Sequence, residues 1–203
     1  MRVVALDVGQ FPDPPAYAVV DRVEPIIGWD AEELRPRRGL AYHVRHLERR
    51  PGVQYVEMVK RAAELCESSE ADELVIDATG VGRPLVELCR ADAGIVARVI
   101  GVTFTGGLQA SQSLAGLDWN VPKGELVAGV RVELEAGRLR VAADLADAEA
   151  LVRELRAFRE VVQASGRVSY GAASGAHDDL VLAVALALWR LRRRPRRCGE
   201  RGA

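Results

Sequence analysis

Two short apolar segments of this chain each carry an aspartate at or near their end, and this feature most constrains the fold. Asp7 lies inside VVALDVG and Asp77 ends LVID. A carboxylate buried without a partner costs free energy, so a charge at either position needs a reason. Open α/β sheets form their sites at the ends of strands. Because Gly9 and Gly80 follow closely and leave space beside each carboxylate, we expect two strands whose aspartates face one site.

The rest of the chain alternates strand-like and helix-like segments, which predicts an α/β domain. Apolar runs and turn residues predict strands at 2–8, 16–23, 25–29, 73–78, 96–103 and 139–142, and a short one near Val168. Residues 41–48 are ambiguous and are interpreted as a further edge strand. Helical spacing predicts helices at 53–67, from Pro84 to Gly94, and at 123–135, 147–162 and 178–193. The last helix is apolar almost all round, so it should be buried.

A third acidic position, Asp178-Asp179, opens that last helix. The N-terminus of a helix favours negative charge. Consecutive helical residues point about 100° apart, so the two aspartates cannot be equivalent. Asp179 shares its face with Ala183 and Ala187, whose small side chains would let the helix approach a sheet closely. We therefore expect Asp179 to be a direct metal ligand and Asp178 a second contact or a helix cap.

Each acidic residue also has a local explanation. Asp7 could pair with an arginine, Asp77 could form a turn with Thr79, and Asp178 or Asp179 could cap the helix. If the two strands are neighbours and the helix packs across them, however, three carboxylates converge. Such a cluster is stable with a hard divalent cation such as Mg²⁺. Two ions there would activate water and stabilise the leaving oxygen of a phosphodiester.

The 203-residue chain has a formal net charge of -1, but its arginines gather in two stretches. Such stretches either neutralise phosphates or form a solvated face or a loose tail. The first stretch contains Arg35, Arg37, Arg38, Arg45, Arg49 and Arg50, and the second contains Arg190, Arg192, Arg193, Arg194, Arg196 and Arg197.

The other titratable and apolar residues exclude several classes of protein. The three cysteines lie far apart, which argues against a disulfide framework or a zinc knuckle; Cys66 and Cys89 are expected to be buried in helices. His43 and His46 have helical spacing but no obvious further zinc ligand nearby. No stretch approaches the roughly 20 apolar residues that a bilayer crossing needs. We expect a cytoplasmic location and no membrane association.

Four segments together resemble the nuclease domain of viral (phage) terminase large subunits. They are ALDVGQ, LVIDATGVGRPLVELCR, VPKGELV and GAHDDLVLAVALALW, in the order of that family and spanning Val3 to about Trp189. The resemblance implies an RNase H-like fold, with a central mixed β-sheet flanked by helices, over residues 1–190. Residues 191–203 would form a basic tail. It also implies endonucleolytic cleavage of double-stranded DNA with Mg²⁺ or Mn²⁺, expected to be two ions, in the bacterial host of a phage or prophage.

The resemblance also assigns roles to residues of this chain. It implies metal binding by Asp7, Asp77 and the Asp178-Asp179 pair, with Asp13 as an accessory ligand. His177 would position water or the scissile phosphate, and the alternative for this residue is a polar loop histidine. DNA contacts are expected at Lys123, Arg45, Arg49, Arg50 and Arg83.

One departure from the family concerns the motor. Packaging terminases carry an ATPase domain with a Gly-x-x-x-x-Gly-Lys-Ser/Thr loop, and this sequence has no such loop. We therefore expect no nucleotide cofactor here, and name a separate ATPase motor, a portal or a small terminase subunit as candidate partners. An excised domain, a separately encoded nuclease and a prophage remnant all fit this departure.

Two other functions remain open at the level of the sequence. The first is an ATP-binding domain of the actin and sugar-kinase type, with Thr79-Gly80-Val81-Gly82 as a phosphate loop. Proteins of that type have two related domains and about twice this length. The second is a non-catalytic DNA-binding or assembly module with the same fold.

Overall fold

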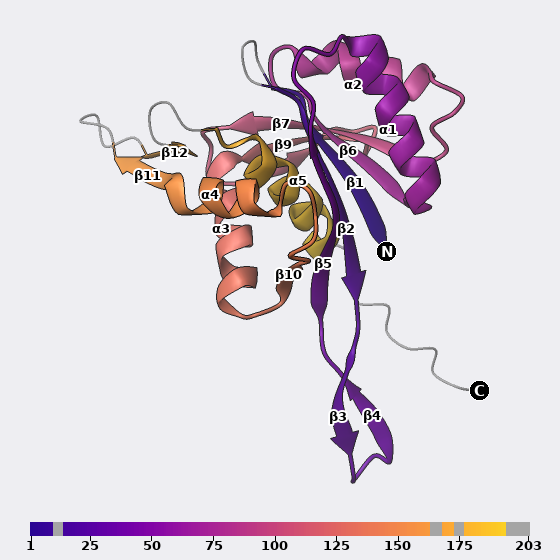
Figure 1. The fold of residues 1–203 in the computed structure, drawn as a ribbon, viewed down its shortest axis with the longest axis vertical. Coiled ribbons are helices and arrows are strands. Elements are labelled where there is room, and N and C mark those ends of the chain that lie inside the picture. The colour runs from indigo at the N-terminus through magenta and orange to yellow at the C-terminus, as the bar shows by residue number, and fades with distance from the viewer. Residues whose placement is uncertain (10–13, 163–167, 173–176, 194–203) are drawn as a thin grey trace.

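A mixed β-sheet of eight strands forms the centre of the protein (Figure 1). The computed structural model describes residues 1–9, 14–162, 168–172 and 177–193. In spatial order the strands are β10 (Leu139–Val141), β5 (Ala41–Arg49), β2 (Ala16–Val23), β1 (Arg2–Asp7), β6 (Glu73–Asp77), β7 (Arg98–Thr105), β9 (Asp118–Pro122) and β8 (Ser111–Gln112). Strand β1 runs antiparallel to β2 and parallel to β6, so the expected mixed sheet is confirmed.

Five helices cover the two faces of this sheet within the described ranges. They are α1 (Tyr55–Ser69), α2 (Gly82–Ala91), α3 (Lys123–Glu135), α4 (Ala148–Ala157) and α5 (Asp179–Arg193). Successive side chains of a strand point to opposite faces. Val3 and Ala5 of β1 therefore join the core under α3 and α5, whereas Val4 and Leu6 join the core under α1 and α2.

Helix α5 lies across β1 and β2 and is buried along most of its length, as its apolar sequence predicts. Near its C-terminal end, Arg190 donates to the buried Glu73 of β6 over 2.5 and 2.9 Å. Arg192 and Arg193 also form ion pairs, with Glu133 and with Glu125 respectively. The helix thus continues to Arg193, beyond residue 190, and the described arginines of the second stretch anchor it instead of forming a tail.

The connection between β2 and β5 forms a two-stranded ribbon of β3 (Ile26–Asp30) and β4 (Arg35–Arg38), which extends away from the main sheet (Figure 1). Its apolar residues are exposed, with Ile26, Ile27 and Trp29 each more than 60% accessible. Strand β4 was not predicted, because its RPRR sequence has no apolar alternation. Strand β5 lies between β10 and β2, so the expectation of an edge strand is corrected.

Two further expectations from the sequence are corrected by pairing between strands. The helix expected at 147–162 ends at Ala157, because residues 158–162 form β11 and pair with β12 (Val168–Ala172). Strand β9 was not predicted, and it pairs with β7 in parallel. Proline fits β9 because Pro122 lies beyond the residues that β8 pairs with, where β9 is the edge of the sheet. Within the described ranges, no helix is long and apolar enough to cross a bilayer.

Candidate metal centre

The sheet brings Asp7 and Asp77 side by side. They are the last residues of the neighbouring parallel strands β1 and β6, directly after the paired residues Leu6 and Ile76. Strand alternation places both aspartates on the face that α5 covers. Both residues are buried, and the charges of their carboxylates act on each other. The predicted proximity of these two aspartates is therefore present in the fold.

The turn after β6 holds Asp77 firmly. The Thr79 amide donates to Asp77 Oδ1 over 2.8 Å, which is the turn that the sequence suggested, and Thr79 Oγ1 accepts from the Phe104 amide over 2.8 Å. Gly80 has a positive φ of 55°, which favours glycine. A Cβ atom at Gly82 would lie 1.9 Å from the Asp77 carbonyl oxygen, so the start of α2 approaches β6 too closely for any other residue.

Asp178 and Asp179 approach the same end of the sheet from the start of α5. The first-turn amides of Leu180 and Val181 donate to Glu154 Oε2 over 3.0 and 3.1 Å. A residue of α4 therefore caps α5. The expectation that the side chain of Asp178 or Asp179 would accept these amides is corrected. Asp178 instead accepts from Lys123 Nζ over 3.1 Å. Asp179 is buried, with 3% of its surface accessible.

The four carboxylates interact electrostatically. Burial raises the pKa of Asp7 well above its ordinary value, and the charges of Asp77, Asp179 and Asp178 raise it further. Burial also raises the pKa of Asp77, although hydrogen bonds from Thr79 and the charge of Lys123 oppose this shift. Without a cation, burial and the neighbouring negative charges therefore disfavour the charged form of this pair.

The donor set fits a hard divalent cation. Mg²⁺ and Mn²⁺ prefer carboxylate oxygens as ligands, and their positive charge would offset the repulsion between the two carboxylates. Within the described residues, no group of three or more His, Cys, Asp or Glu side chains already stands at metal-binding spacing. Asp7, Asp77 and Asp179 would therefore have to draw closer around an ion.

The other residues singled out from the sequence divide into two groups. Lys123 and His177 lie at the cluster, with His177 Nδ1 3.6 Å from Asp179 Oδ2. Arg49 also lies there, in ion pairs with Glu154 and Asp179. Away from the cluster, the structure pairs Arg45 with Asp21, Arg50 with Glu48 and Arg83 with Asp118, while Asp13 lies outside the described residues.

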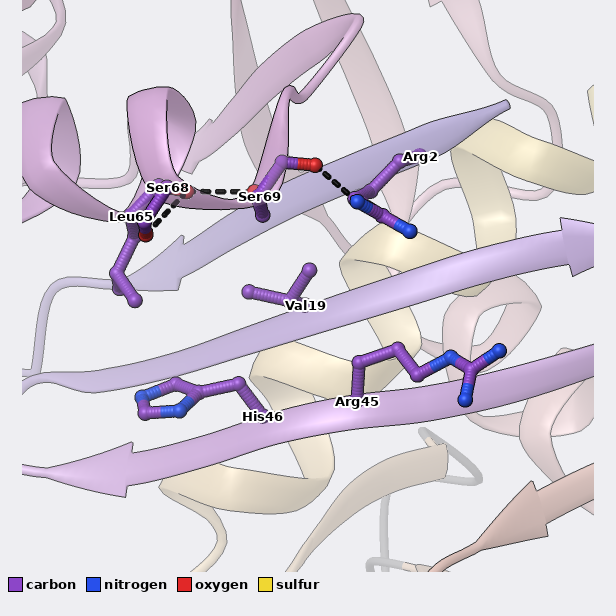
Figure 2. A pocket seen from close by; sticks show the side chains of 7 residues that line it. All are labelled: Arg2, Val19, Arg45, His46, Leu65, Ser68 and Ser69. Atoms are coloured by element: carbon purple, nitrogen blue, oxygen red, sulfur yellow. Dashed lines mark hydrogen bonds between the residues drawn. The ribbon is translucent and has the colours of Figure 1, made fainter.

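A cavity of about 350 Å³ lies between β2, β5 and α1, on the sheet face opposite α5 (Figure 2). Its polar side chains already have partners: Arg2 and Arg45 both donate to Asp21. Burial alone would raise the pKa of Asp21, but these hydrogen bonds outweigh it and lower the pKa. The cavity is therefore separate from the acidic cluster. Its lining residues are Arg2, Val19, Arg45, His46, Leu65, Ser68 and Ser69.

Sequence reasoning missed Glu154 altogether. It predicted an amphipathic helix over 147–162 and gave this glutamate no role, yet the residue is 6% accessible. The sequence held one indication of such a residue. The start of α5 is buried, and the free amides of its first turn need an acceptor from elsewhere in the chain. His43 and His46 lie on strand β5, so the helical spacing that favoured a zinc pair is absent.

A comparison with protein families identifies the family of this chain. The sequence model of the terminase RNase H-like domain matches residues 35–191. The chain belongs to this family. The match supports the resemblance seen in the sequence and leaves the ATP-binding alternative without support. A comparison with curated protein sequences finds no match.

Solved structures of phage terminase nucleases have the same fold. The large terminase nuclease of thermophilic phage G20c with bound magnesium is 24% identical, with a TM-score of 0.61, over 94% of this chain and 81% of that chain. The nuclease domain of bacteriophage SPP1 with bound Mn is 14% identical, with a TM-score of 0.54, over 93% and 85%. A K428A mutant of the bacteriophage Sf6 large terminase subunit with calcium is 15% identical, with a TM-score of 0.61, over 92% and 87%.

Proposed function

We propose that this domain is a Mg²⁺- or Mn²⁺-dependent endonuclease that cleaves double-stranded DNA, as part of a phage DNA-packaging terminase. The observation that carries the proposal is the buried pair of Asp7 and Asp77, with Asp179 adjoining it from α5. The family match and the metals named in related structures support the same reading. A separate ATPase motor, a portal or a small terminase subunit would be its partners.

The residues of the cluster would divide the work as follows. Asp7, Asp77 and Asp179 hold the cation, and Asp178 makes a second contact. When bound, one or two ions would activate water and stabilise the leaving oxygen. Lys123, already 3.1 Å from Asp178, would orient a phosphate oxygen beside the carboxylates. His177, half-exposed beside Asp179, would position the attacking water or the scissile phosphate.

DNA contacts away from the cluster would come from arginines with accessible guanidinium groups. Arg83 and Arg50 are 56% and 44% exposed and pair with Asp118 and Glu48, so a phosphate can compete for each. Such contacts are sequence-independent and weaken as salt rises. Arg45 lies on the opposite face of the sheet, and its contact with DNA requires a duplex that passes around the sheet edge.

The test is cleavage of supercoiled plasmid by the purified chain, with EDTA, Mg²⁺ and Mn²⁺ in parallel. We expect nicked and linear DNA only with a divalent metal. Asp77→Asn should abolish cleavage, because a neutral amide removes the negative charge by which the carboxylate would hold a hard cation. Asp144→Asn is the matched control, since this aspartate is exposed between β10 and α4 and should leave cleavage unchanged.

The results decide between the two functions open for this fold. Cleavage by Asp77→Asn at the wild-type rate would show that the acidic cluster is not the site. A folded protein that binds DNA but cleaves with neither metal would favour the non-catalytic module. Gel-shift measurements on the same samples separate loss of binding from loss of cleavage.

A further inference from the structure

Glu154 connects two elements that meet beside the acidic cluster. Its Oε2 accepts the amides of Leu180 and Val181, while its Oε1 forms an ion pair with Arg49. The side chain is only 7% exposed. Both of its oxygens are thus occupied by protein groups, so Glu154 is a poor candidate for a metal ligand although it lies near the cluster.

Arg49 bridges two carboxylates from the end of β5. Its terminal nitrogen contacts Glu154, and its Nε lies 3.6 Å from Asp179 Oδ2. The second distance is an ion pair longer than a hydrogen bond. The Arg49 amide also donates to Asp147, at the start of α4, over 3.1 Å. The guanidinium is therefore held by α4 and touches Asp179 only loosely.

We propose that Glu154 and Arg49 are positioning residues that keep Asp179 available for the divalent cation. This inference rests on the proposed function. Glu154 holds the charged end of Arg49, and Arg49 in turn orients Asp179 without forming a tight pair with it. Residues that interact with a metal ligand in this way orient it, and their loss typically lowers metal affinity about 10- to 100-fold.

The arrangement gives a specific expectation for Glu154→Gln. Glutamine keeps an acceptor for the two α5 amides, so the helix cap survives, but it loses the charge that holds Arg49. Arg49 would then pair closely with Asp179, the other carboxylate it already contacts. A guanidinium bound to Asp179 competes directly with a cation, so metal binding should weaken.

The experiment measures Mn²⁺ affinity of the full chain by electron paramagnetic resonance of free Mn²⁺, with no DNA present. Glu154→Gln should raise the dissociation constant about 10- to 100-fold. The double variant Glu154→Gln/Arg49→Met should bind Mn²⁺ as tightly as Arg49→Met alone, because the guanidinium that competes with the cation for Asp179 is gone. Glu149→Gln is the matched control, since it is on the same helix with its side chain 93% exposed.

A merely structural role predicts a different pattern. If Glu154 only stabilised the fold, adding Arg49→Met would lower the melting temperature further and rescue nothing. Wild-type Mn²⁺ affinity in Glu154→Gln, or no rescue in the folded double variant, would overturn this inference. If Glu154→Gln does not fold, Arg49→Lys tests the same point: lysine cannot bridge both carboxylates and should weaken Mn²⁺ binding about tenfold.

Failure of the proposed function has its own signature. A wild-type chain that is folded but binds no Mn²⁺ would overturn the metal site, and this inference with it. A wild-type chain that binds Mn²⁺ and cleaves plasmid, beside a Glu154→Gln variant that does both equally well, would overturn only the positioning role.

Discussion

The buried ion pair at the far end of α5 offers a sharp test of the energetics of the fold. Arg190 and Glu73 have side chains only 10% and 1% exposed, and two hydrogen bonds join them. Arg190→Met keeps much of the apolar stem and removes the guanidinium, so the buried Glu73 carboxylate loses the two charge-assisted hydrogen bonds from this partner. Breaking a buried pair in this way typically costs about 3–5 kcal/mol.

That loss corresponds to a measurable change in melting temperature. Unfolding entropy is about 2.1 cal/mol/K per residue, which gives about 0.43 kcal/mol/K for a chain of 203 residues. A loss of about 3–5 kcal/mol therefore lowers the melting temperature by about 7–12 °C. Replacing both partners, with Glu73→Leu and Arg190→Met, removes the buried charge and should recover most of this loss.

Thermal and urea unfolding followed by circular dichroism would measure these differences. Arg131→Met is the matched control, because Arg131 forms an exposed pair with Glu135 on α3 and should change stability by about 0.5 kcal/mol or less. The reasoning would be refuted by a loss below about 1 kcal/mol in Arg190→Met. It would also be refuted if the double variant were less stable than either single one.

Three further predictions concern other parts of the fold. Gly82→Ala should cost about 1–3 kcal/mol of stability and disturb Asp77, because its Cβ would lie 1.9 Å from the Asp77 carbonyl oxygen; urea unfolding and Mn²⁺ affinity would measure both effects. The lowered pKa of Asp21 contributes stability that is present above its unfolded pKa and lost as pH falls through the folded value. Asp21→Asn should therefore destabilise the protein at pH 7 and progressively less as the pH falls below the unfolded pKa of this carboxyl, and a loss of stability that does not change with pH would contradict the ion-pair reasoning. Burial raises the pKa of the Cys66 and Cys89 thiols to about 12, so neither should react with a disulfide reagent at pH 8 until urea is added.

The sequence predicted the strand aspartates because a charge inside an apolar run has few explanations. Asp7 and Asp77 interrupt β-forming segments, and the parallel pairing of β1 and β6 then places them together without further information. Asp179 could be predicted because it opens a helix that is apolar on all sides. For these three aspartates, the local sequence and the rules of sheet topology both predict a position at the ends of the strands.

The residues that support the cluster could not be predicted in the same way. A glutamate such as Glu154 on an amphipathic helix is ordinarily solvated, and only the three-dimensional packing of α4 against α5 turns it into a cap. Arg49 looked like one member of a basic stretch, whereas the fold uses it inside an ion-pair network. Charge pairing between distant segments leaves no periodic pattern in a sequence, so these contacts required the structure.

The ribbon of β3 and β4 has a consequence for how the domain can change. Strands β2 and β5 pair with each other up to Val23 and Ala41, so the ribbon between them adds nothing to the register of the main sheet. A shorter or longer connection would leave the positions of Asp7 and Asp77 unaltered. The length and surface chemistry of the ribbon can therefore vary without changing the end of the sheet that carries the acidic cluster.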